Sequence, residues 1–110
     1  MSGKFKKSRL TGQTAFGAVY AGARYATVDL VYYYTRASQL QGRVGIVVGK
    51  KAFAGAVVRN RIKRRLRELY RQFVAVFADL DLVIVVKGGR REPQYGSLER
   101  QFKTLAGKIR

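Results

Sequence analysis

Residues 57–73 read VVRNRIKRRLRELYRQF and carry seven Arg or Lys but a single acid, Glu68. Cations three and four residues apart repel one another on a helix, so such a run is costly unless an anion neutralises it. Asn60, between Arg59 and Arg61, can both donate and accept hydrogen bonds, whereas Arg can only donate. The segment therefore predicts polyanion binding, with Asn60 contacting a ribose hydroxyl or a base edge. The alternatives are a solvated helix face and an Asn that is simply tolerated near a helix start.

Three consecutive tyrosines, Tyr32, Tyr33 and Tyr34, are the second candidate group. If they lie on a strand, alternation places them on both faces of a sheet, so at least one points away from the core. A phenol ring beside cations can stack on an unpaired base, although packing in the core or at an edge is equally compatible with the pattern. Lys50, Lys51 and the basic residues near the N-terminus would add phosphate affinity without sequence preference.

Catalysis by the chain itself is not expected. The sequence has no Cys and no His, and its six acids are scattered. Thiolate nucleophiles, imidazole bases and the usual zinc ligands are therefore absent, and a metal site would need several distant acids to converge. We predict no catalytic residue and assign no metal ligand; if the protein serves an enzyme, another component supplies the chemistry.

Composition points to one folded, basic domain. The 110 residues carry a net charge of +17, yet 47% of them are hydrophobic, which is more than a disordered basic tail would hold. We expect a single domain over 1–110, with 1–9 as a basic arm. Apolar runs are far shorter than the roughly 20 residues that span a bilayer, and the start lacks the apolar region of a secretory signal, so we expect a cytoplasmic protein without a membrane partner.

The elements that must position these groups begin with a short amphipathic helix over 11–23, with Thr14 available as its cap. Strands follow over 27–35 and 43–48, for which a hairpin is the economical connection. After the second strand, Lys50 and Lys51 lead through a Gly- and Ala-rich loop into the basic segment.

The basic segment itself reads as a long helix. Its apolar stripe comprises Val58, Ile62, Leu66, Leu69, Phe73 and Phe77. Asn60, Arg64, Arg67 and Arg71 form the opposite ridge. The nearly continuous apolar run 81–87 predicts a strand covered on both faces, and Ser97 is a plausible N-cap for a closing helix. Together the elements predict one mixed sheet with helices packed on it.

Several segments, in this order, resemble the bacterial ribonuclease P protein subunit: RVGIVVGKK, VVRNRIKRRLRELYR and DLVIVV, preceded by a helix with Phe16 and Tyr20. The Arg59–Asn60–Arg61 core is the most specific motif, and the match runs from about Arg9 to the closing helix. Lys87 stands where the family commonly has Arg, which precludes assuming a bidentate phosphate contact there.

This resemblance implies an α+β fold: an α-β sandwich with one central mixed sheet of about four strands, three helices and a left-handed βαβ crossover through the long helix. It also implies a function: a small subunit that joins a catalytic RNA, one protein per RNA, and helps it remove the 5′ leader of precursor tRNA. The RNA, with Mg²⁺, would do the cutting.

The resemblance also assigns site residues. It places these on the contact with the catalytic RNA: Arg59, Asn60, Arg61, Lys63, Arg64, Arg67, Lys50 and Lys51. Phe16, Tyr20 and Tyr34 match the wall of a cleft for the single-stranded leader, although a shift of one residue would give the role of Tyr34 to Tyr33. Two other readings of the chain stay open: a structural RNA-binding protein of the ribosomal type, and a nonspecific DNA-compacting protein.

Overall fold

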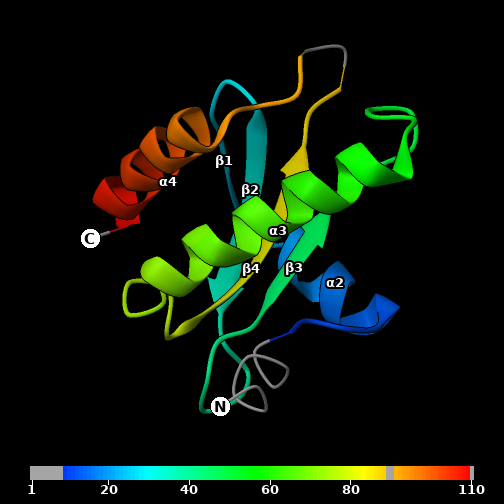
Figure 1. The fold of residues 1–110 in the computed structure, drawn as a ribbon. Helices are drawn as coiled ribbons and strands as arrows, with labels where there is room; N and C mark the ends of the chain where they lie inside the picture. Colours follow the sequence, from blue (N-terminus) through cyan, green and yellow to red (C-terminus); the bar gives the residue numbers. More distant parts are fainter. Residues whose placement is uncertain (1–8, 89–90, 110) are drawn as a thin grey trace.

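The computed structural model describes residues 9–88 and 91–109. Within these ranges the chain forms three helices and one four-stranded sheet (Figure 1). In chain order the elements are α2 (Gln13–Tyr20), β1 (Ala23–Ala26), β2 (Leu30–Arg36), β3 (Val44–Val47), α3 (Ala56–Gln72), β4 (Leu80–Val86) and α4 (Tyr95–Ile109). The predicted α-β sandwich is confirmed. Most of the predicted basic arm, 1–9, falls outside the described residues.

The sheet has the order β1-β2-β4-β3, in which β4 is antiparallel to β2 and parallel to β3. Leu82 and Ile84 of β4 pack into the larger core, which includes residues of α3 and α4, while Val83 packs into a smaller core with residues of α2. A strand that is apolar on both faces is stabilised most in the middle of a sheet with cover on both sides. The prediction for 81–87 is therefore confirmed.

The connection from β3 through α3 to β4 is a crossover between neighbouring parallel strands. In Figure 1 both strands run upward, α3 lies in front of the sheet, and β4 lies to the left of β3. This arrangement is left-handed, the opposite of nearly all βαβ units. The handedness agrees with what the family resemblance implies.

The predicted hairpin between the strands at 27–35 and 43–48 is wrong, because β4 lies between β2 and β3. The start of β3 is held to β4 by Arg43 and the buried Asp81. The Arg43 backbone N–H donates to Asp81 Oδ1 at 3.0 Å, and Arg43 Nη2 lies 2.9 Å from Asp81 Oδ2. This long-range ion pair helps to set the order of the strands and has no signal in local sequence pattern.

The N-terminal part of the fold differs from prediction in two ways. Helix α2 is shorter than 11–23 and begins after Gly12, whose φ of 90° suits glycine, so Thr14 is not the cap. After Ala21 and Gly22, the chain forms β1 (Ala23–Ala26), which no pattern predicted. Gly22 allows this turn back onto the sheet, since a Cβ there would lie 2.4 Å from the Tyr34 carbonyl oxygen.

The long helix α3 packs its apolar stripe into the core as predicted, but it ends at Gln72, so Phe73 is its C-cap residue and Phe77 lies beyond the helix. Ile62, Leu66 and Leu69 are fully buried in the larger core, together with Leu98 and Phe102 of α4. Helix α4 begins at Tyr95, two residues before the predicted cap Ser97. Burial of one side of α3 fixes which side carries the cations, and this positions the candidate site.

Candidate nucleic-acid interface

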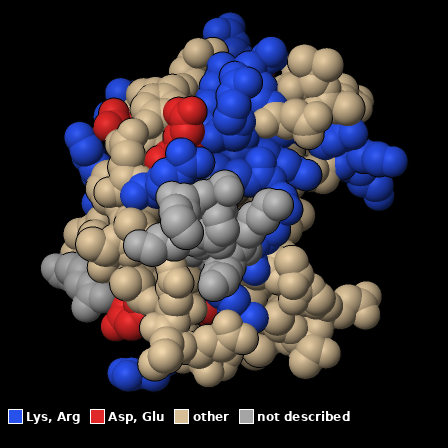
Figure 2. Space-filling model, turned by 60° about the horizontal axis from the view of Figure 1, so that its bottom comes forward, with Lys and Arg blue, Asp and Glu red and all other residues tan. Residues whose placement is uncertain are grey.

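The positive charge of the chain gathers on the surface (Figure 2). On the face shown, Lys and Arg form a broad patch, whereas Asp and Glu occupy small separate areas. Helix α3 has no acidic residue in its first turn, and its buried stripe leaves Asn60 and Arg64 exposed. The predicted segregation of cations from the apolar stripe is therefore present in the fold.

The two arginines of the Arg-Asn-Arg motif are engaged within the chain. Arg59 Nη1 donates to the carbonyl oxygens of Phe53 and Ala54, at 2.8 and 2.7 Å. These bonds hold the end of the preceding loop on the first turn of α3. Asn60, between the two arginines, stays exposed to solvent.

Arg61 pairs with Glu92, which precedes α4. Arg61 Nη2 and Arg65 Nη1 both donate to this carboxylate at 2.8 Å, and Arg65 also donates to the Pro93 carbonyl oxygen at 2.9 Å. The hydrogen bond from Arg61 lowers the pKa of Glu92, and the same bond raises the pKa of Arg61. One carboxylate thus joins α3 to the segment before α4. Sequence reasoning missed this cluster, although the spacing of Arg61 and Arg65 places both on one side of the helix.

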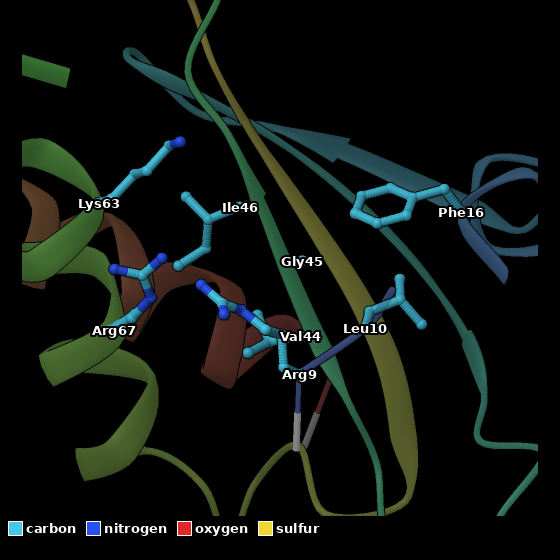
Figure 3. Close-up of a pocket in the computed structure, with 8 residues that line it drawn as sticks. All are labelled: Arg9, Leu10, Phe16, Val44, Gly45, Ile46, Lys63 and Arg67. Atoms are coloured by element: carbon cyan, nitrogen blue, oxygen red, sulfur yellow. The ribbon is translucent and has the colours of Figure 1, made fainter. Parts of the chain in front are cut away.

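Lys63 and Arg67 lie in a pocket of about 130 Å³ at the open edge of β3 (Figure 3). Arg9 and Phe16 also line the pocket, and β3 passes between the α3 cations and the Phe16 ring in the view. Burial, followed by the nearby charge of Arg9, lowers the pKa of Arg67. Among the described residues, no carboxylate forms an ion pair with Arg9, Lys63 or Arg67. The pocket therefore concentrates positive charge that no carboxylate of the described chain balances.

The edge of β3 adds backbone groups to this pocket. The Leu10 N–H donates to the Val44 carbonyl oxygen at 2.8 Å, so the backbone of Val44 faces away from β4. Because backbone groups alternate along a strand, Ile46 presents its N–H and C=O on the same outer edge. An unpaired strand edge can hydrogen-bond a ligand directly.

The aromatic residues divide between the two faces of the sheet. Phe16 and Tyr20 of α2 lie with their ring centroids 6.3 Å apart, and Tyr20 meets Tyr33 edge to face at 4.9 Å. Tyr34 instead packs against the larger core on the other face. Burial, and then the nearby Tyr33, raises the pKa of Tyr20. The structure thus brings Tyr33, not the predicted Tyr34, to the aromatic cluster, because neighbouring strand residues point to opposite faces.

The remaining predicted basic residues lie apart from the pocket. Lys50 and Lys51 are exposed on a turn after β3, where the Ala52 and Phe53 N–H groups donate to the Gly49 carbonyl oxygen. Lys87 is engaged: its Nζ donates to the Thr27 carbonyl oxygen at 2.7 Å. Lys50 and Lys51 are therefore open to an anionic partner.

The described residues contain no group of three or more His, Cys, Asp or Glu side chains arranged to hold a metal ion. The same part of the chain has no helix that is long and apolar enough to cross a membrane. The side chains gathered here are cations and aromatic rings, which suit contacts with phosphates and stacking on bases.

Comparison of the sequence with known proteins shows which family the chain is similar to. A family model described as Ribonuclease P matches residues 5–110. The ribonuclease P protein component of Streptococcus agalactiae is 34% identical over 98 residues, covering 88% of this chain and 89% of the relative. That of Pseudanabaena sp. is 35% identical over 107 residues, covering 94% and 92%.

Solved structures of ribonuclease P proteins share the fold of this chain. The RNase P protein of Staphylococcus aureus superposes with a TM-score of 0.81 at 22% identity, covering 94% of this chain and 95% of that one. The RNase P protein of Thermotoga maritima gives 0.76 at 23% identity, covering 93% and 97%. The chain has a mixed sheet with a left-handed crossover and a long basic helix with the Arg-Asn-Arg motif, and the family match covers nearly its whole length. We conclude that this chain belongs to the ribonuclease P protein family.

Proposed function

We propose that this chain is the accessory protein of a ribonucleoprotein nuclease, and that it binds both the catalytic RNA and the 5′ leader of precursor tRNA. The observation that carries the proposal is the pocket at the β3 edge. There, Lys63 and Arg67 from α3 line the same cavity as Phe16 from α2. Cations for phosphates and an aromatic ring for bases are the two elements of a single-strand binding surface.

The roles of the α3 residues follow from their contacts. Asn60 and Arg64 are exposed and free to meet the folded catalytic RNA. Arg59 and Arg61 hold neighbouring segments in place through the bonds described above. Both stay partly exposed, so they would contact the catalytic RNA as well. Lys50 and Lys51 extend the positive surface beyond the start of α3.

The leader would run across the other end of the pocket. Phe16, Tyr20 and Tyr33 offer rings on the α2 face of the sheet, and Tyr20 is 42% exposed. Stacking on aromatic side chains contributes about 1 to 3 kcal/mol per base and tolerates any sequence. Such tolerance suits a leader, whose sequence differs among precursors.

Hydrolysis itself would take place in the RNA, with Mg²⁺ bound there, and one protein would serve one RNA. The chain's own residues would bind, orient and neutralise. Their cations would reduce the repulsion between the leader and the catalytic RNA and so lower the concentration of Mg²⁺ needed for cleavage.

The test is reconstitution. The protein is mixed with bacterial ribonuclease P RNA at low Mg²⁺, and cleavage of a precursor tRNA is followed by gel electrophoresis. We expect strong stimulation over RNA alone. Binding to the RNA without stimulation would instead favour a structural RNA-binding protein of the ribosomal type, and equal binding to any duplex DNA would favour nonspecific compaction.

A further inference from the structure

The ring of Phe16 rests directly on β3 at Gly45. If Gly45 carried a Cβ, this atom would lie 2.5 Å from Phe16 Cζ and 2.7 Å from Phe16 Cε1. The three heavy atoms nearest to that position all belong to the Phe16 ring, the third at 3.4 Å. Figure 3 shows the ring directed at this point of the strand. The missing side chain of Gly45 is therefore the space that the ring occupies.

Nothing else about position 45 calls for glycine. Among the described residues, only Gly12 has a positive φ. Gly45 pairs with Val83 in a regular parallel ladder, and its neighbour on the same face of β3 is Val47. Glycine inside a strand weakens it, and often marks a place where another group approaches closely. The approaching group here is an aromatic ring that also lines the cationic pocket.

We propose that Gly45 is a positioning residue that sets the depth of the Phe16 ring and thereby the grip of the protein on an unpaired RNA strand. This inference rests on the proposed function. With glycine, the ring sinks to the level of the strand and stands beside the outer edge of β3, in the same cavity as Arg67. A base stacked on the ring then has its phosphate within the field of the α3 cations.

A methyl group at position 45 would push the ring outward but would disturb little else. The clashing atoms are the far end of a side chain that can rotate, not backbone. Gly→Ala also reduces the freedom of the unfolded chain, which offsets part of any strain. The substitution should therefore displace the ring while the fold persists, and so it separates binding from stability.

The experiment uses Gly45→Ala in the holoenzyme reconstituted with the catalytic RNA. Equilibrium dissociation constants are measured for a precursor tRNA with a leader of several nucleotides and for the mature tRNA. We expect about a 3- to 10-fold weaker affinity for the precursor, since part of one base stack is lost, and no change for mature tRNA. Gly49→Ala is the matched control, because no atom lies within 4 Å of its added Cβ and its φ is not positive; it should change neither constant.

A double-mutant cycle with Phe16→Ala shows whether Gly45 acts through the ring. Without the ring the methyl group meets no clash, so Gly45→Ala should cost nothing more in the Phe16→Ala background. An equal cost in both backgrounds, or an equal loss for precursor and mature tRNA, would overturn the inference.

Two further outcomes separate this inference from the proposed function. If Phe16→Ala leaves precursor affinity unchanged, the leader-binding role fails. Thermal melting then still reports the contact, because Gly45→Ala must be less favourable for the melting temperature when Phe16 is present than in the Phe16→Ala background. If Gly45→Ala does not fold, the Phe16→Ala/Gly45→Ala protein must fold, because only the ring stands in the way. A double variant that stays unfolded would contradict the assignment.

Discussion

Arg67 gives the sharpest test of the cationic pocket, because its replacement should weaken RNA binding without destabilising the free protein. Its guanidinium is partly buried beside Arg9, and both effects lower its pKa, so the charged form is disfavoured in the free fold. A phosphate of bound RNA would favour the charged form of Arg67 and so offset the effects of burial and of Arg9. Arg67→Ala should therefore weaken RNA binding and leave the free protein equally or more stable.

The magnitudes follow from the loss of one phosphate contact. The slope of log affinity against log salt should fall by about 0.7 to 0.9. A hydrogen bond to a charged group contributes about 1.5 to 3 kcal/mol when it is well shielded. Partial exposure to solvent reduces this toward about 1 kcal/mol, or a 5-fold loss of affinity near physiological salt. Like-charge relief should raise the free energy of unfolding by less than about 1 kcal/mol.

The assay is a titration of the catalytic RNA with protein at several salt concentrations, together with urea unfolding of the free protein. Lys103→Ala is the control, because Lys103 is an exposed cation on α4, away from the pocket. An unchanged salt slope for Arg67→Ala, or the same change for Lys103→Ala, would mean that Arg67 is simply solvated and would refute the reasoning.

Other predictions concern the aromatic face, the acidic partners Glu92 and Asp81, and added anions. Tyr33→Ala should weaken binding of leader-bearing precursor about 5-fold or more relative to mature tRNA, whereas Tyr34→Ala should lower the free energy of unfolding without this selectivity. Glu92 has a pKa below its ordinary value of 4.5, so its pairing with Arg61 stabilises the fold above that pH and is lost as the pH falls through the lowered pKa; Glu92→Gln should flatten the pH dependence of the melting temperature in this acid range. Asp81→Ala should cost about 2 to 3 kcal/mol in urea unfolding, because it leaves Arg43 without its partner. Inorganic phosphate or pyrophosphate should raise the melting temperature of the free protein, because binding to the folded state opposes charge repulsion.

Each of these predictions has a result that would contradict it. Equal effects of Tyr33→Ala on precursor and mature tRNA would assign its ring to packing alone. A Glu92→Gln protein whose melting follows the same pH curve as the parent would show that the pair contributes nothing to folding. An unchanged urea midpoint for Asp81→Ala would show that the ion pair with Arg43 does not stabilise the fold. A melting temperature that stays constant when phosphate is added at constant ionic strength would contradict stabilisation by anions.

Much of the fold could be predicted because strong periodic patterns coincide with burial. The stripe containing Ile62 and Leu66 packs on the sheet as expected, and the apolar run of β4 occupies the centre of that sheet. Strand order could not be predicted from pattern, since the Arg43–Asp81 pair joins residues that are far apart in sequence. The handedness of the crossover came only from the family resemblance, because periodicity carries no information about chirality.

The candidate site, like the fold, could be predicted only in part from the sequence. The cations of α3 follow from the apolar stripe, which determines the opposite surface. The engagement of Arg61 by Glu92 and the approach of Phe16 to Gly45 depend on loops and layers that come together only in the fold. The choice between Tyr33 and Tyr34 required the register of β2, because a shift of one residue reverses the face of every side chain.

The pocket at the β3 edge should make the protein a binder of the leader as well as of the catalytic RNA. The most direct measurement compares the affinity of the holoenzyme and of the catalytic RNA alone for precursor and mature tRNA at the same low Mg²⁺. We expect the protein to raise affinity for precursor tRNA well beyond any gain for mature tRNA. An equal gain for both would contradict it.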